Sequence, residues 1–227
     1  MGDFAGFPKE TAQFLAGIAA NNDKAWFDGN RHLYEAGYVE PGRAFVTAMG
    51  PRLRTLSPTV QFEPKVNGSI SRINRDIRFS KDKRPYKDHL DLWFWHGDRR
   101  GWDCPGFWFR LTAEKVYLGT GMHGLQKEHL DSFRHAVVLP RSGKALVRAV
   151  EEVKAAGPYE IGEKTRKLPP RGFETDADRA DFLLYEGLTA STELPATAAR
   201  EADFLDLCFK HFSATWPIGK WLLDEIA

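Results

Sequence analysis

Apolar side chains recur at helical spacing through the first quarter of the chain. Residues 14–18 predict a short helix, and the apolar and aromatic side chains of residues 26–34 fall on one face of a second. A third helix is expected over residues 41–56, with an apolar stripe that contains Pro51. Because proline lacks a backbone N–H group, we expect it to kink or split this helix.

The period then changes to the alternation that is typical of β-strands. Residues 90–95 are apolar on both faces and predict an interior strand, and residues 107–111 and 116–118 predict two strands joined by a hairpin. Residues 61–74 are expected to add one or two strands, interrupted at Asn67-Gly68.

Helical spacing returns after Gly124. Further elements are expected as helices over residues 130–137, 143–156, 176–184, 204–212 and 218–226, and as a strand over residues 185–193. A long polar connection, residues 157–175, separates two of these helices, and its length indicates either a functional or a mobile segment.

This order of elements predicts the fold class. Helices come first, hairpin-like strands follow, and helices return, whereas a parallel α/β protein alternates the two regularly. The sequence therefore predicts an α+β fold with a mainly antiparallel sheet flanked by helices. No composition shift marks a linker, so residues 1–227 are expected to form a single domain.

Composition excludes several classes of protein. The chain has 227 residues, of which 42% are hydrophobic and 28% are charged, with a net charge of +1. These values exclude a disordered protein, and the apolar runs are too short to span a membrane. Two distant cysteines, Cys104 and Cys208, form no disulfide framework, and residues 1–10 show no signal peptide. We therefore expect a cytoplasmic protein that does not contact membranes.

The balanced total hides a local asymmetry of charge. Residues 65–88 carry eight basic and three acidic side chains, a net charge of +5, which leaves −4 for the rest of the chain. Residues 173–227 carry eleven acidic and four basic side chains. This distribution predicts two faces of opposite sign.

The basic segment contains the strongest candidate binding site. Its arginines recur every third residue, and arginine is suited to forked recognition of phosphate or carboxylate. The candidate ligand-binding residues of this segment are Arg72, Arg75, Asp76, Arg78, Ser80, Lys83, Tyr86 and Lys87. The alternative interpretation is a charged loop held by ion pairs, each of which is worth little when exposed.

Side-chain parity divides the arginines of this segment. In an extended chain, successive side chains point to opposite faces, so Arg72, Asp76 and Arg78 share one face and Arg75 lies on the other. We expect Asp76 to pair with Arg72 or Arg78, and Arg75 to find a separate partner. At least half of the motif is therefore expected to be structural.

A glycine pattern follows the predicted hairpin. Residues 119–124 match G-x-G-x-x-G between a strand and a helix, the order that a dinucleotide site requires. The acid expected about 20 residues later is absent, because Lys144 lies there. We interpret Gly119 and Gly121 as a turn in close backbone contact with a neighbouring strand or a ligand, which Arg134 is expected to help bind.

The sequence gives little indication of metal binding, nucleophilic catalysis or nucleic-acid binding. The histidines form no metal-binding motif, and His89 and Asp91 are interpreted as a structural pair. The sequence contains no nucleophile motif and identifies no cofactor. Five aromatic residues near the basic segment could stack on nucleic acid, but strand spacing and the balanced charge favour core packing instead; they are Trp93, Trp95, Trp102, Phe107 and Trp108.

At residues 72–87 the chain resembles a known family. The run from Arg72 to Lys87 resembles the signature of the domain of unknown function 2461 family, as do parts of the first helical region, Gly119-x-Gly121, Arg134 and residues 170–173. The resemblance spans nearly the whole chain. It implies a single α+β domain, and it implies no activity, cofactor or catalytic residue.

Two hypotheses of different classes follow. In the first, the basic segment binds an anionic or phosphorylated small ligand, and catalysis is left open. In the second, the protein is a non-enzymatic interaction module whose basic face binds an acidic partner or a second copy of the chain. A concave arginine cluster would favour the ligand site, and a flat, solvated row would favour the partner surface.

Overall fold

The computed structural model describes residues 4–97 and 104–227. The helical elements are α1 (Lys9–Ala20), α2 (Lys24–Gly29), α3 (Arg31–Tyr34), the π-helical turn η1 (Glu35–Val39), α4 (Glu40–Leu56), α5 (Lys127–Val138), α6 (Pro140–Ala156), α7 (Ala177–Ala180), the 3-10 turns η2 (Asp181–Leu184) and η3 (Ala196–Arg200), and α8 (Phe204–Glu225). The strands are β1 (Leu90–Trp95), β2 (Gly106–Leu111), β3 (Lys115–Met122), β4 (Glu160–Ile161) and β5 (Leu188–Pro195).

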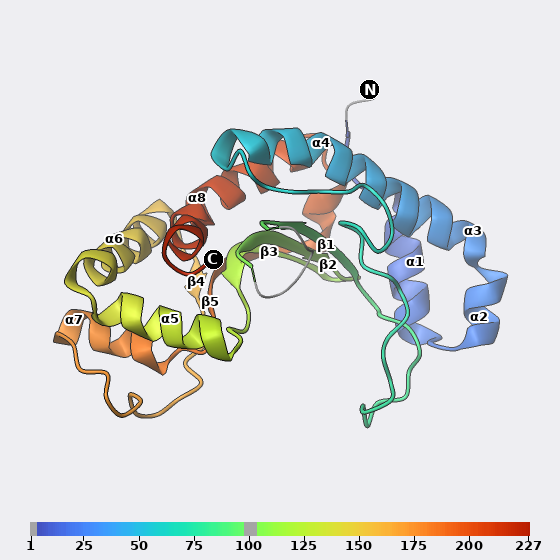
Figure 1. Ribbon diagram of the computed structural model, residues 1–227. Coiled ribbons are helices and arrows are strands. Elements are labelled where there is room, and N and C mark those ends of the chain that lie inside the picture. Colours follow the sequence, from blue (N-terminus) through green and yellow to red (C-terminus); the bar gives the residue numbers. More distant parts are fainter. Residues whose placement is uncertain (1–3, 98–103) are drawn as a thin grey trace. The chain divides into compact units, whose positions relative to one another are not determined.

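The strands of the described residues form a single antiparallel sheet of five (Figure 1). Their order is β1-β2-β3-β5-β4, so β5 enters beside β3 after the intervening helices. The predicted hairpin between β2 and β3 is confirmed, because the N–H of Thr112 donates to the carbonyl of Lys115 at 2.8 Å. The α+β class expected from the sequence is therefore confirmed.

The chain divides into two compact units. The first comprises residues 1–94, 108–117 and 193–209, and the second comprises residues 95–107, 118–192 and 210–227. Four of the strands and α8 contribute residues to both units. The single folding domain expected from the sequence remains a prediction.

Aromatic rings dominate the core of the first unit. Phe7 stacks on Phe109 with ring centroids 5.8 Å apart, and Phe45 packs against Phe109 at 5.0 Å. Phe204 completes the cluster from the beginning of α8. All four side chains are buried, and each contributes about 1.5–3 kcal/mol through the area that it removes from water.

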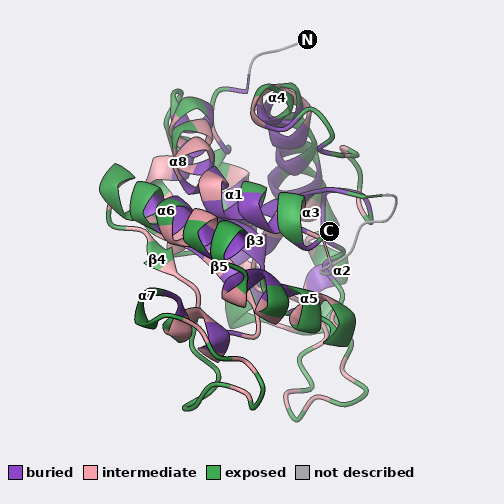
Figure 2. Ribbon diagram, turned by 60° about the vertical axis from the view of Figure 1, so that its left-hand side comes forward, coloured by how far each residue is buried: buried purple, intermediate pink, exposed green. Residues whose placement is uncertain are grey.

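The core of the second unit joins α5, α6, α8 and the inner face of β5. Phe133, Leu146 and Leu222 are among its fully buried side chains. Trp221 is buried as well, and its indole N–H donates to the carbonyl of Ser142 at 2.9 Å. The buried residues of α5 and α6 lie on one side of each helix and the exposed residues on the other (Figure 2).

A buried arginine links α7 to the end of α5. The side chain of Arg179 is 3% exposed, and its guanidinium donates to the carbonyls of Val137 and Val138 at 3.3 and 3.0 Å. It also pairs with Asp176 at 2.5 Å. The last carbonyls of a helix have no partner within it, so Arg179 supplies the donors that α5 lacks.

The structure corrects several expected boundaries. Residues 61–74 form isolated β-bridges and no named strand, since Asn67 adopts a left-handed φ of 64° and turns the chain. Helix α4 continues through Pro51, because its buried stripe holds it together despite the missing backbone bond. Likewise, α8 runs through Pro217 as one helix. Residues 26–34 belong to two short helices, α2 and α3.

Among the described residues, no helix combines the length and the hydropathy that a membrane crossing requires. Cys104 and Cys208, the cysteines of the described residues, form no disulfide.

Candidate functional site

The basic segment folds as an irregular hairpin, residues 72–88, which we call the basic hairpin. Asn74 and Tyr86 form an antiparallel bridge, and the N–H of Arg75 donates to the carbonyl of Pro85 at 2.9 Å. The arms continue into the bridge between Ile70 and Leu92 at the start of β1. In Figure 1 the hairpin is the narrow teal loop whose tip lies on the side away from α4.

Ion pairs within the hairpin confirm the pairing predicted from side-chain parity. Two nitrogens of Arg78 donate to the carboxylate of Asp76, the shortest bond being 2.7 Å. Arg75 finds a separate partner in Asp82 at 2.8 Å, and Arg84 donates to the same carboxylate. Hydrogen bonds from Arg84 and Arg75 lower the pKa of Asp82 far below its usual range, and those from Arg78 lower the pKa of Asp76.

At the base of the hairpin, Asp91 collects three basic side chains. Arg110 donates to it at 2.7 Å, the Nε2 of His89 lies 3.3 Å away, and Lys87 lies 3.4 Å away. Burial disfavours the charged carboxylate, but the hydrogen bonds from His89 and Arg110 outweigh burial and lower the pKa of Asp91. The structural pairing of His89 with Asp91 is therefore confirmed.

Tyr86 fastens the second arm of the hairpin to the helices. Its ring is buried and stacks on Phe27 with centroids 4.5 Å apart. The side-chain amide of Asn22 accepts from the N–H of Tyr86 and donates to its carbonyl, both at 3.0 Å. The structure thus gives the Tyr86 ring a packing role, and its role in ligand binding remains a prediction.

The tip of the hairpin is exposed. The side chain of Arg78 is 77% exposed, Arg72 is exposed, and Arg75 is half-buried. Phe79 is 92% exposed, and the Arg78 guanidinium lies 5.7 Å from the centre of its ring. The arginines therefore form a solvated row rather than a buried cluster.

The remaining candidates of the hairpin take intermediate positions. Lys83 donates from Nζ to the carbonyl of Ile77 at 2.9 Å, which fastens the tip loop from inside. Ser80 is half-buried, and its N–H donates to the same carbonyl at 3.4 Å. Lys87 is 23% exposed and directed to Asp91.

Gly119 and Gly121 do not form the expected turn. Both lie inside β3 and continue its pairing with β5. A Cβ atom at Gly121 would lie 2.2 Å from the carbonyl oxygen of Leu188, and one at Gly119 would lie 2.1 Å from that of Ala190. The two glycines are thus required by close approach to a neighbouring strand, which was one of the two expected explanations.

Arg134 lies on α5. Like Gly119 and Gly121 of β3, it belongs to the second unit. Its side chain is 12% exposed, and its nearest carboxylates are those of Asp131 at 3.6 Å and Glu186 at 3.9 Å. The ring of Phe173 lies 6.0 Å from its guanidinium. The basic hairpin belongs to the first unit, whereas Gly119, Gly121 and Arg134 belong to the second. Their expected contribution to a ligand site with the hairpin remains a prediction.

The aromatic residues near the basic segment belong to the core, as expected. Trp93, Trp95 and Phe107 are buried, and Trp108 is half-buried. Trp102 lies outside the described residues. Phe79 was not among the predicted site residues, although an aromatic side chain inside a charged run is a signal that could have identified it.

A family model described as "Conserved hypothetical protein (DUF2461)" matches residues 10–221. No curated protein matches the chain.

Proposed function

The chain belongs to the DUF2461 family, whose description names no activity, and we propose from the geometry that it is a non-enzymatic interaction module. Its basic hairpin, residues 72–88, binds an acidic surface of a partner protein. The exposed Phe79 ring beside the Arg78 guanidinium is the observation that carries this proposal.

An exposed aromatic ring among cations fits a protein surface better than a small anion. Covering an exposed phenylalanine ring with a partner removes it from water and lowers the free energy of the complex. Aromatic residues and arginine also contribute much of the binding energy of protein interfaces. A phosphorylated metabolite would need the arginine donors to converge, with no use for the ring. The solvated row of arginines therefore favours the second of the two hypotheses.

Within the described chain, three cations of the hairpin carry no ion pair, and one of them, Lys83, donates to the carbonyl of Ile77. Arg72, Lys81 and Lys83 have no carboxylate within ion-pairing distance among the residues that the structure describes. The three aspartates of the hairpin are already engaged by its other cations: Asp76 by Arg78, Asp82 by Arg75 and Arg84, and Asp88 by Arg84. An acidic surface would complete the pairing of the free cations and accelerate encounter.

The hairpin presents these groups in a fixed arrangement. The Arg75–Asp82 pair ties its two arms together, and the Asn22 amide holds Tyr86 at its base. A segment that is already ordered loses less conformational entropy when it binds. Pairs that contribute little to folding can therefore contribute to binding.

The proposal is tested with a labelled peptide of alternating glutamate and leucine, measured by fluorescence anisotropy. We expect binding that weakens as salt rises from about 50 to about 300 mM, because exposed charges are screened over that range. The double variant Lys81→Ala/Lys83→Ala and the single variant Phe79→Ser should each weaken binding about tenfold, a loss of about 1.4 kcal/mol.

The matched control is Lys9→Ala/Lys24→Ala, which removes the same charge from exposed positions of α1 and α2. Equal losses in the control and the hairpin variants would contradict the proposal. Displacement of the peptide by inorganic phosphate alone would favour the small-ligand hypothesis, and tighter binding of single-stranded DNA would indicate a nucleic acid. Sedimentation equilibrium of the same variants shows whether a second copy supplies the acidic surface.

A further inference from the structure

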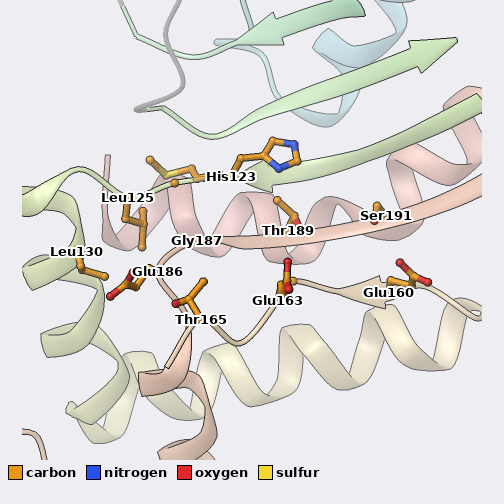
Figure 3. Close-up of a pocket in the computed structure, with 13 residues that line it drawn as sticks. His123, Leu125, Leu130, Glu160, Glu163, Thr165, Glu186, Gly187, Thr189 and Ser191 are labelled. Carbon is orange, nitrogen blue, oxygen red and sulfur yellow. The ribbon is translucent and has the colours of Figure 1, made fainter. Parts of the chain in front are cut away.

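A cavity of about 630 Å³ opens on β4 and β5, within the second unit (Figure 3). Its volume lies in the range of pockets that hold small organic ligands. None of its lining residues belongs to the basic hairpin, so the inference drawn from it is independent of the proposed function.

Strand register explains how the cavity forms. Glu160 on β4 pairs with Ser191 on β5, and directly opposed residues place their side chains on the same face of a sheet. Thr189 on β5 and Gly187, which directly precedes β5, follow on that face at the strand period, so small residues occupy all three positions. The other face of β5 carries Leu188 and Ala190, which are buried in the core. The hollow therefore lies where the sheet lacks large side chains.

The two ends of the cavity differ in chemistry. Figure 3 shows Leu125 and Leu130 at one end, next to Glu186 and Thr165, and Glu160 at the other end on the side of Ser191. Glu163 lies between them, near the hydroxyl of Thr189. One end thus offers apolar contact beside the carboxylate of Glu186, and the rest offers the imidazole of His123, two further carboxylates and hydroxyl groups.

Glu160 and Glu163 are exposed residues, and the protein does not neutralise their carboxylates. Neither has an ion-pair partner in the part of the chain that the structure describes, and Lys164, the neighbour of Glu163, pairs instead with Asp181 at 2.8 Å. The third acid of the lining, Glu186, is engaged by Arg166 at 3.4 Å. The lining itself contains no lysine or arginine among the described residues.

The shape and the charge together select an organic cation. The residues that the structure describes bring together no group of three His, Cys, Asp or Glu side chains suited to a metal ion. A protonated amine needs one or two carboxylates and hydroxyl acceptors, and a short apolar body would fill the end lined by the two leucines. We infer that this cavity binds a small organic cation of that kind, an amine attached to a short apolar group.

The test compares three probes of nearly equal size: benzylamine, benzyl alcohol and benzoate. Saturation-transfer NMR and calorimetry on the full chain measure their binding. We expect benzylamine to bind with a Kd of about 1 mM or below, and the neutral and anionic probes to bind at least about tenfold more weakly. Equal affinity for benzylamine and benzyl alcohol would overturn the inference, as would the absence of benzylamine binding.

Two variants locate the binding site. Glu160→Gln/Glu163→Gln keeps the shape of the cavity and removes its free charge, so it should reduce benzylamine affinity at least about tenfold. The control Glu151→Gln/Glu152→Gln removes the same charge from exposed positions of α6 and should leave the affinity unchanged. Ser191→Leu fills the hollow and should abolish binding with an unchanged far-UV spectrum. Equal effects of the first variant and its control would refute the assignment.

Discussion

Arginine is used in opposite ways at the basic hairpin and at the contact between α7 and α5. In the hairpin, Arg78 is 77% exposed and its partner Asp76 belongs to the same loop. In the second unit, Arg179 is 3% exposed and donates to two helix carbonyls. The run of basic residues identifies the hairpin in the sequence, whereas Arg179 belongs to no such run.

The difference shows how solvent determines what a charged side chain contributes. Water already solvates an exposed ion pair, so forming it changes the free energy of folding little. A buried guanidinium has lost its water, so each of its hydrogen bonds becomes necessary. We therefore expect the isolated arginine to matter for folding and the cluster to matter for binding.

The largest effect is expected for Arg179→Ala. The substitution leaves the carbonyls of Val137 and Val138 without their donor and opens a gap beside Gly143. We expect the free energy of unfolding in urea to fall by about 2–4 kcal/mol, because two buried carbonyls lose their donor and a gap remains. Arg171→Ala removes an exposed arginine of the same unit and serves as the control. A loss equal to that of the control would show that Arg179 contributes no more to folding than an exposed arginine does.

A smaller effect is expected for Asp91→Asn, at the base of the hairpin. Its side chain is 14% exposed, and the substitution removes the charge that Arg110, His89 and Lys87 share, so we expect a loss of about 2 kcal/mol at pH 7.

The same variant should also flatten the pH dependence of stability. The pKa of Asp91 is lowered below its ordinary value of 3.8, so its contribution is complete above that value and is lost as the pH falls through the lowered pKa. Wild type should thus lose more stability on acidification than Asp91→Asn. The exposed Asp203→Asn variant is the control, and parallel pH curves for wild type and Asp91→Asn would contradict the expectation.

Asp76→Ala should shift the urea midpoint less than Asp91→Asn does. Both partners of its ion pair are exposed, so water replaces the lost contact. A shift as large as that of Asp91→Asn would show that the tip loop also supports the fold.

Phe79→Ser is expected to have the smallest effect on folding. Its ring is 92% exposed, so the free energy of unfolding should stay within about 0.5 kcal/mol of wild type. Phe109→Ala, which empties part of the core of the same unit, should cost about 3–5 kcal/mol. A clear loss for Phe79→Ser would indicate that the ring packs within the chain.

Local periodicity predicted most of the fold. The spacing of apolar residues identified α1 and α5, which each bury one side against the core, and strands β1 to β3, of which β1 is buried on both faces. Residues 61–74 form isolated bridges where strands were expected, and the interruption expected at Asn67-Gly68 is present at the left-handed Asn67. Pro51 does not split α4, whose buried stripe continues across it, and the expected kink remains a prediction.

The contacts of the candidate site could be predicted only where the two partners lie close together in the sequence. Side-chain parity predicted that Asp76 pairs with Arg78 or Arg72, because both partners lie within four residues. The cavity in the second unit depends on the register of Glu160 against Ser191, which are thirty-one positions apart. No local pattern reveals such a register, and none distinguishes Arg179 from a surface arginine.

The division of the chain into interleaved units has a consequence for its inheritance. Each unit is assembled from three separate stretches of sequence, so no single cut or fusion of the gene transfers one unit intact. Recombination that exchanges contiguous segments would break both cores at once. The two units are therefore expected to pass together through evolution, and a family match that extends over residues 10–221 agrees with that expectation.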